Sequence, residues 1–245
     1  MKIAVINFSG NVGKTTVARH LLLPRVEGAG LVAVESLNAD DGQGTSQALR
    51  GRQFGELQEY LQTIDNIVVD IGASNVEDLV GLMRKYRDSH EDFDYFVVPT
   101  VSAFKQQQDT IATLAELAGL GVAASRIKLV FNMVEPGLDI AVAFDTLLSY
   151  LDKSEVASAS TQCCLSANEI YGRLKALRAG SADRAPDLAA VAADQTDYKA
   201  LIGKAGNVEE KLALAHALAT RRLARGVVPE LDACFAALEM EPATT

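Results

Sequence analysis

Tryptophan is absent from this chain of 245 residues, and only 6% of the residues are aromatic. The three cysteines are an odd number, and neither disulfide-framework nor zinc-ligand spacing is present. No apolar run approaches the roughly 20 residues that span a bilayer. The apolar run at residues 3–7 is too short for a secretion signal. We therefore expect a soluble, reduced, cytoplasmic protein without a membrane span.

An excess of basic residues is also lacking, since the formal net charge is -9. Proteins that coat nucleic acid with their whole surface need many Lys and Arg residues, so that class is disfavoured, although a local basic patch is not. Apolar residues make up 49% of the chain and charged residues 22%. These values suit one α/β domain with a sizeable core and a small helical appendage.

Short apolar runs alternate with segments of helical spacing as far as about residue 132. The runs that read as strands are residues 3–7, 31–34, 66–71, 95–100 and 127–132. The segments that read as helices between them are residues 14–23, 54–62, 76–87 and 106–117. Continuous apolar strands separated by helices are typical of a parallel sheet that is covered on both faces. The pattern predicts an α/β fold with a doubly wound, mostly parallel sheet.

After this region the spacing becomes mostly helical. The expected helices are residues 141–151, 169–177, 208–225 and 228–238, with an irregular connection at 179–197. We therefore divide the chain into an α/β domain, residues 1–180, and a helical extension packed on it, residues 181–245.

A glycine-rich loop joins the first strand to the first helix. Its nucleotide-binding residues are Gly10, Asn11, Val12, Gly13, Lys14, Thr15 and Thr16. Glycines let the backbone approach phosphate closely, and the N-terminus of the following helix favours an anion. Lys14 is expected to neutralise the β- and γ-phosphates, and Thr15 to coordinate Mg²⁺. The alternative is a glycine-rich turn with a solvated lysine, but strand, loop and helix all agree with a P-loop.

The same segment resembles the deviant Walker A loop of the ParA/MinD family, with the consensus K-G-G-x-G-K-T. Here the sequence is Ser9-Gly10-Asn11-Val12-Gly13-Lys14-Thr15. Two positions depart from the family. Ser9 replaces the signature lysine, which in family dimers reaches the partner's nucleotide, and Asn11 replaces a glycine. The resemblance implies the SIMIBI/ParA-like class of P-loop fold.

Three further positions are candidate site residues. Asp70 ends an apolar strand and resembles the family's Walker B aspartate, a Mg²⁺ ligand, while the alternative is a helix cap. Asp41 resembles the family's water-positioning residue, with Glu35 or Asp40 as substitutes and a solvated acidic loop as the alternative. Asn132 matches the family's adenine-binding asparagine, whereas the alternative is a turn-forming residue. The resemblance thus gives Lys14, Asp41 and Asp70 catalytic roles.

Within the family, the chain looks most like the StbB-type plasmid stability proteins. This resemblance implies a slow, Mg²⁺-dependent ATPase that binds ATP or ADP and acts as a switch in plasmid stability or partition, with a link to conjugation. It also implies a homodimer with ATP, a small DNA-binding adaptor protein as partner, and indirect or non-specific contact with DNA.

Two other functions fit the loop. A P-loop kinase would transfer the γ-phosphate to a small molecule, and its lid arginines would be Arg50 and Arg52. A nucleotide-gated binding module would hardly hydrolyse ATP, which agrees with the absence of the signature lysine.

Base preference is the first testable expectation. ATP should bind more tightly than GTP, because Asn132 is present and the guanine-binding pattern N-K-x-D is not. A wrong base that leaves a buried polar group unpaired costs about 1–3 kcal/mol. Calorimetric titration with both nucleotides measures the difference, and an equal or higher affinity for GTP would show that the assignment of Asn132 is wrong.

Overall fold

The structure is a computed structural model that describes residues 1–34, 51–157, 159–179 and 187–241. The chain forms two compact units, one made of residues 1–167 with 233–245 and the other of residues 168–232. The division expected from the sequence, 1–180 and 181–245, differs from these units in where residues 168–180 and 233–245 fall. The division into two domains at residue 180 stays a prediction.

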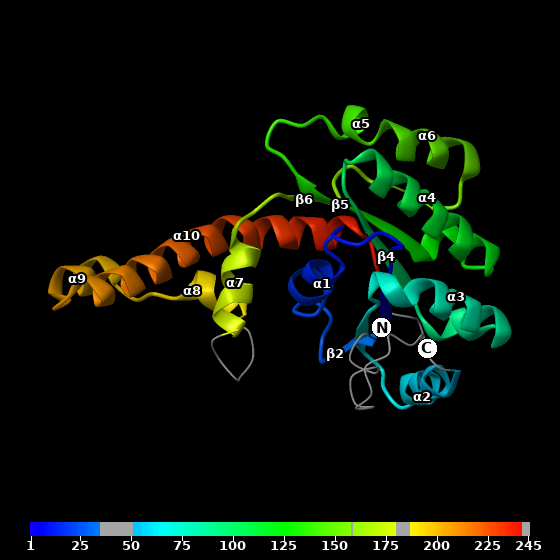
Figure 1. Cartoon of the computed structure of the whole chain (residues 1–245), viewed down its shortest axis with the longest axis horizontal. Coiled ribbons are helices and arrows are strands. Elements are labelled where there is room, and N and C mark those ends of the chain that lie inside the picture. Colours follow the sequence, from blue (N-terminus) through cyan, green and yellow to red (C-terminus); the bar gives the residue numbers. More distant parts are fainter. Residues whose placement is uncertain (35–50, 158, 180–186, 242–245) are drawn as a thin grey trace. The chain divides into compact units, whose positions relative to one another are not determined.

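The larger unit contains a six-stranded sheet with the order β2-β3-β1-β4-β5-β6 (Figure 1). Every neighbouring pair of strands is parallel. The strands are β1 (Lys2–Val5), β2 (Gly30–Ala33), β3 (Ile67–Asp70), β4 (Tyr95–Thr100), β5 (Ile127–Val134) and β6 (Cys164–Ser166). After β1 the chain forms β2 and β3 on one side and then β4, β5 and β6 on the other. This topology confirms the doubly wound parallel α/β fold.

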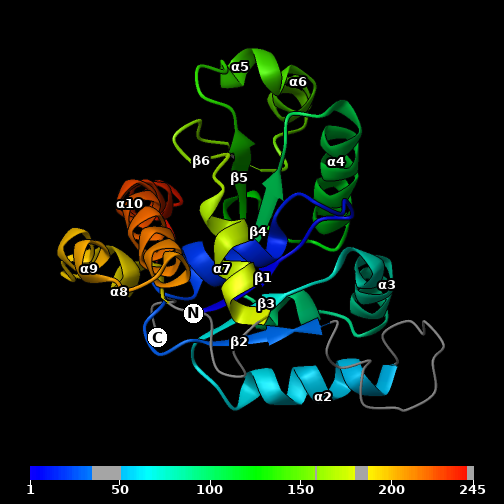
Figure 2. The same ribbon diagram turned by 60° about the vertical axis from the view of Figure 1, so that its left-hand side comes forward.

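Helices of the larger unit connect these strands. They are α1 (Lys14–Thr16) with its π-helical continuation η1 (Val17–Leu22), α2 (Gly51–Gln62), α3 (Val76–Lys85), α4 (Phe104–Gly119), α5 (Ile140–Ala143) and α6 (Asp145–Ser154). Short 3-10 turns are η3 (Ala73–Asn75), η4 (Ser89–Asp92) and η5 (Ala124–Arg126). Figure 2 shows α3, α4 and α6 on the same side of the sheet.

The core follows from the alternation of side chains along each strand. Ala4 and Ile6 of the first strand segment lie in the same buried cluster as residues of α2, α3, α4 and α6. Ile3 and Val5, which alternate with them, are also fully buried. Successive residues of a strand point to opposite faces, so both faces of the sheet are covered. This explains why the sequence shows continuous apolar runs.

The smaller unit is helical. It holds α7 (Ile170–Ala179), α8 (Leu188–Ala193), α9 (Tyr198–Lys204) and most of α10 (Val208–Ala237). Arg221 donates from Nη1 to the carbonyl oxygens of Asp194 and Thr196, at 3.1 and 2.6 Å. Arg225 donates from Nε to the carbonyl oxygen of Ala192 at 2.9 Å. These arginines therefore satisfy carbonyl groups that the end of α8 leaves unpaired.

Several elements differ from the sequence expectation, and the helix expected at 141–151 is divided into α5 and α6. Strand β6 and helices α8 and α9 were not expected, because three to seven residues are too few for a clear period. Residues 208–225 and 228–238 were expected to form two helices, but α10 is continuous through Pro229. A proline inside a helix costs about 3 kcal/mol. Val227 and Leu231 on either side of it are buried, and a continuous helix keeps both on one face.

The chain past α10 is anchored within the larger unit. The Tyr95 hydroxyl donates to the carbonyl oxygen of Glu241 at 3.1 Å and accepts from its N–H at 3.0 Å. Lys128 Nζ, near the start of β5, donates to the carbonyl oxygen of Glu239 at 3.4 Å. Across the described ranges, no helix has the length and apolar character needed to cross a lipid bilayer.

Candidate functional site

The glycine-rich loop leaves the sheet at its centre. It follows β1, which lies between β3 and β4. The connection from β1 leads to β2 at one end of the sheet, and the connection from β4 leads to β5 in the opposite direction, so the loop lies at the point where the order reverses. In open α/β sheets this is where ligands bind, outside the carboxyl ends of the strands.

Two residues of the loop have positive φ. Gly13 has φ +84°, and a Cβ atom there would lie 2.1 Å from Asn132 Nδ2, so no other residue fits. Asn11 has φ 57°. Asparagine tolerates the left-handed region better than most residues, because its short side chain can form local hydrogen bonds. The backbone of the loop therefore accommodates Asn11 in place of the family's glycine.

Lys14 is buried at the start of α1, with only 8% of its surface exposed. Its ammonium group donates to the carbonyl oxygens of Asn7 at 3.0 Å and Ser9 at 2.6 Å. The side chain thus turns back over the loop that precedes it. A cation held by backbone carbonyls beside a helix N-terminus makes this loop suited to an anion.

Thr15 and Asp70 are 55 residues apart in sequence but meet in the structure. The Thr15 hydroxyl donates to Asp70 Oδ2 at 2.7 Å. Asp70 ends β3, which is the neighbour of β1, so both groups lie at the carboxyl edge. A hydroxyl and a carboxylate are oxygen ligands of the kind that Mg²⁺ takes together with water and phosphate oxygens. This donor set fits the expected Mg²⁺ site.

Asn132 also lies against the loop. Its side chain is 98% buried, and Nδ2 donates to the carbonyl oxygen of Val12 at 2.8 Å. The side chain thereby supports the loop between Val12 and Gly13, a contact that the sequence does not reveal. Its role in adenine recognition stays a prediction.

The remaining predicted site residues fall as follows. Gly10 is exposed, Val12 is buried, and Thr16 is partly buried on α1. Asp41 and its substitutes Glu35 and Asp40 lie outside the described residues, as does Arg50. The roles assigned to all of these residues stay predictions.

A buried polar network behind the loop was missed by sequence reasoning. The Asn7 amide donates to the Pro99 carbonyl oxygen at 2.9 Å and to Thr110 Oγ1 at 2.8 Å. Its Oδ1 accepts from the Ser9 N–H at 2.8 Å. Thr113 Oγ1 accepts from the Phe8 N–H at 3.0 Å. Asn7, Thr110 and Thr113 are all fully or almost fully buried.

This network fixes the first half of the loop to helix α4. Two threonines at spacing i, i+3 on the buried face of an otherwise ordinary helix were the available sequence signal. The hydroxyls of Thr110 and Thr113 also donate to carbonyl oxygens four residues back in α4, so their burial alone does not reveal a partner outside the helix. We regard Asn7, Thr110 and Thr113 as positioning residues for the phosphate loop.

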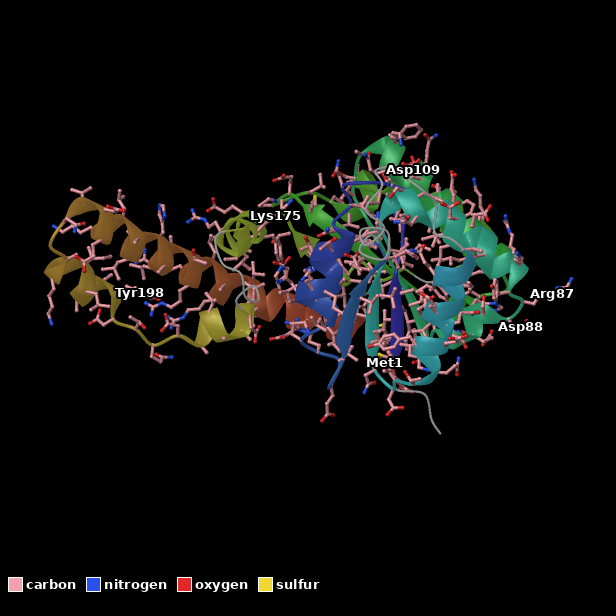
Figure 3. All side chains as sticks on the ribbon, turned by 60° about the horizontal axis from the view of Figure 1, so that its bottom comes forward. Met1, Arg87, Asp88, Asp109, Lys175 and Tyr198 are labelled. Carbon is pink, nitrogen blue, oxygen red and sulfur yellow. The ribbon has the colours of Figure 1, made fainter. Side chains whose placement is uncertain are left out.

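Ser9, in place of the signature lysine, is 97% buried. Its hydroxyl contacts the carboxylate of Asp109, and Lys105 pairs with the same carboxylate at 2.8 Å. Asp109 lies on α4 (Figure 3). The Lys105 ammonium, with a smaller contribution from the Ser9 hydroxyl, lowers the pKa of Asp109 below its ordinary value. The exposed Lys105 and the buried Ser9 therefore share the Asp109 carboxylate as a partner.

Comparisons with known proteins give only structural similarities. No family model matches the chain, and no curated protein matches its sequence. A complex of ATP with a variant of McdA from Cyanothece is 15% identical, with 71% of this chain and 86% of that chain covered and a TM-score of 0.44. MinD with Mg-ADP from Pyrococcus horikoshii is 14% identical, with 70% and 83% covered and a TM-score of 0.44.

A Borrelia burgdorferi protein assigned to plasmid partition, bound to AMPPNP, is 14% identical over 89% of this chain and 96% of that chain, with a TM-score of 0.45. With identities this low and TM-scores below 0.5, these similarities do not decide what the chain binds.

Thr113 provides a test of the loop's anchor. Thr113→Val keeps the shape of the side chain but leaves the Phe8 N–H without its acceptor, whereas Thr113→Ser keeps the hydroxyl. A buried unpaired donor costs about 1–3 kcal/mol, part of which should appear as displacement of the loop. We expect Thr113→Val to weaken ATP binding and Thr113→Ser to restore it, as measured by calorimetry alongside thermal unfolding.

If both variants lose stability equally and bind ATP like the wild type, Thr113 has a structural role only.

Proposed function

We propose that the chain is a ParA-like ATPase that binds Mg²⁺-ATP at residues 10–16 and acts as a slow nucleotide switch in plasmid stability or partition. The observation that carries the proposal is the contact of the Thr15 hydroxyl with Asp70 at 2.7 Å, beside the buried ammonium group of Lys14. Phosphate charge and a metal ion would then meet complementary groups from the start of α1 and the end of β3.

Each residue has a distinct part in this proposal. Lys14 neutralises the phosphate oxygens, and the backbone N–H groups at the start of α1 orient them. Thr15 and Asp70 hold Mg²⁺, which supplies positive charge at the phosphates. The loop itself is held by Asn132 through the Val12 carbonyl and by Asn7 through the Ser9 N–H. Asp41 is proposed to orient the attacking water.

The contacts of Ser9 support the proposal that ATP hydrolysis is slow. A cation that reaches the transition state of phosphoryl transfer can contribute about 10³–10⁵ in rate. Ser9 carries no charge, and its hydroxyl is engaged with Asp109. This observation also favours the second candidate function, a nucleotide-gated binding module that hardly hydrolyses ATP. The kinase alternative has no support from the described residues.

An ATP-dependent homodimer is part of the proposal. It is supported by exposed apolar side chains at the end of β5, in the chain that follows it and at the start of α4 after β4, on the same sheet edge as the loop. These side chains are Phe104, Met133, Leu138 and Val142. Apolar side chains gathered beside a binding site are typical of a protein interface. The small DNA-binding adaptor, the contact with DNA and the link to conjugation are proposed from the sequence resemblance.

Lys14→Ala tests the nucleotide site. The variant should lose ATP binding and phosphate release, because it removes the buried cation that is proposed to neutralise the phosphates. Its melting temperature without nucleotide should stay close to that of the wild type. Lys85→Ala, which removes an exposed lysine on α3, is the matched control. Wild-type turnover by Lys14→Ala would refute the assignment.

Ser9→Lys tests the reason for slow turnover. The wild type should release phosphate slowly at every protein concentration. Ser9→Lys should gain a rate that rises with protein concentration, because the cation would act on a partner's nucleotide. Ser9→Met, which has a long side chain without charge, is the control.

Fast wild-type turnover that does not depend on protein concentration would contradict the proposal that the missing lysine limits hydrolysis. An equal gain by Ser9→Met would attribute the effect to the altered loop rather than to charge.

A further inference from the structure

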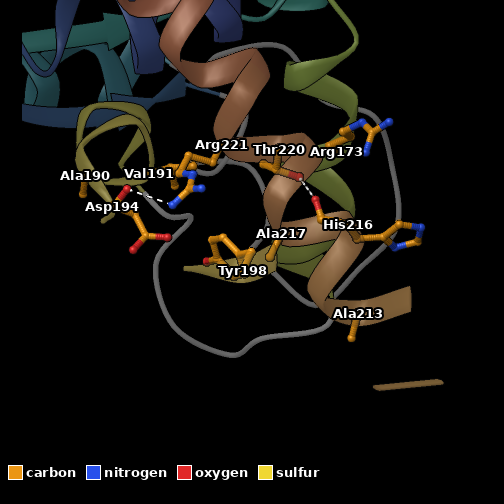
Figure 4. A pocket seen from close by; sticks show the side chains of 10 residues that line it. All are labelled: Arg173, Ala190, Val191, Asp194, Tyr198, Ala213, His216, Ala217, Thr220 and Arg221. Atoms are coloured by element: carbon orange, nitrogen blue, oxygen red, sulfur yellow. Dashed lines mark hydrogen bonds between the residues drawn. The ribbon is translucent and has the colours of Figure 1, made fainter. Parts of the chain in front are cut away.

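The smaller unit contains a cavity of about 1010 Å³ among α7, α8, α9 and α10 (Figure 4). Its apolar wall is made of small side chains, Ala190 and Val191 of α8 and Ala213 and Ala217 of α10. Larger side chains at these positions would fill the space. The volume lies at the upper end of the range of about 300–1,000 Å³ for small-molecule sites, which are also mainly apolar.

The acceptor groups at the cavity wall already have partners. Asp194 accepts hydrogen bonds from the Thr196 hydroxyl at 2.6 Å and from the Thr196 N–H at 2.9 Å. These bonds, together with one from the Tyr198 hydroxyl, lower the pKa of Asp194 to about 2. The Thr220 hydroxyl donates to the carbonyl oxygen of His216 at 2.8 Å. The wall therefore offers little to a cationic ligand.

The donors at the wall are less fully used. The guanidinium of Arg221 lies over the Tyr198 ring at 4.8 Å, and its Nε is buried without an acceptor in the described part of the chain. Arg173 pairs only loosely with the exposed Glu169, at 3.5 Å. Two guanidinium groups and one carboxylate give this wall a positive balance. A buried donor without an acceptor requires an explanation, and a bound ligand is one.

We propose that this cavity binds a small amphipathic organic anion. Its apolar part would lie against Ala213 and Ala217, and its acidic group would accept hydrogen bonds from Arg221 and Arg173. The combination of an apolar wall with a few convergent polar groups fits such a ligand. Charge-assisted hydrogen bonds from a guanidinium are among the stronger polar contacts, so the acidic group would fix the ligand's orientation.

The test uses two fluorescent probes with the same ring system. 1-Anilinonaphthalene-8-sulfonate carries a negative charge, and N-phenyl-1-naphthylamine does not. Both are titrated into the full chain with saturating ATP and Mg²⁺, and again into Lys14→Ala, so that binding at the phosphate loop is recognised. We expect one sulfonate probe per chain, unchanged by Lys14→Ala, and weaker binding of the neutral probe.

Cavity-filling variants locate the site. Ala213→Leu and Ala217→Leu should each weaken binding of the sulfonate probe by about tenfold or more, since the added atoms occupy ligand space. Ala213 is exposed, so its replacement should not disturb folding. Ala215 is on α10 but is not among the residues that line the cavity, so Ala215→Leu should leave binding of the sulfonate probe unchanged. Arg173→Met should weaken binding of the sulfonate probe but not of the neutral one.

Two results would overturn the proposal. One is unchanged sulfonate binding in folded Ala213→Leu, or an equal loss in Ala215→Leu. The other is neutral-probe binding to the wild type that is as tight as sulfonate binding.

Discussion

The side-chain amide of Asn7 determines where the glycine-rich loop begins. The backbone leaves the parallel ladder after Ile6, whose N–H donates to the Val97 carbonyl oxygen at 3.0 Å. Beyond that point buried backbone groups need other partners. Asn7 supplies them, since it pairs with the Pro99 carbonyl oxygen and the Ser9 N–H. The carbonyl groups of Asn7 and Ser9 then hold the Lys14 ammonium, so the position of the cation depends on the same junction.

Helix α4 links this junction to the surface. Thr110 and Thr113 face the loop from within the core, whereas Phe104 and Lys105 at the start of the same helix are exposed. A change in the loop would be passed through short, fully buried hydrogen bonds to an exposed apolar residue. Such coupling needs a rigid element with polar contacts at one end. In the proposed switch, α4 would have this role.

The two units differ in net charge. Between residues 168 and 232 there are nine acidic and ten basic residues, while the whole chain has a net charge of -9. The larger unit therefore carries the negative excess and also the buried core. In the smaller unit, arginines hold the end of α8 through backbone carbonyls. The three cysteines all belong to the larger unit. Burial raises the pKa of the Cys163 thiol to about 11, so in the larger unit this thiol stays protonated at neutral pH.

The sequence by itself determined the parallel α/β fold and the position of the glycine-rich loop between β1 and α1. These features are local signals, because they can be read from neighbouring residues alone. They are the continuous apolar strands, the helical spacing, and Gly13 followed by Lys14. Only the tertiary structure decided that Thr15 meets Asp70, that Asn132 supports the loop, and that Asn7 and Thr113 anchor it. Each of these pairs joins residues or elements whose approach depends on strand order. A hydrogen bond between them leaves no periodic trace in the sequence, because its partners belong to different strands and helices.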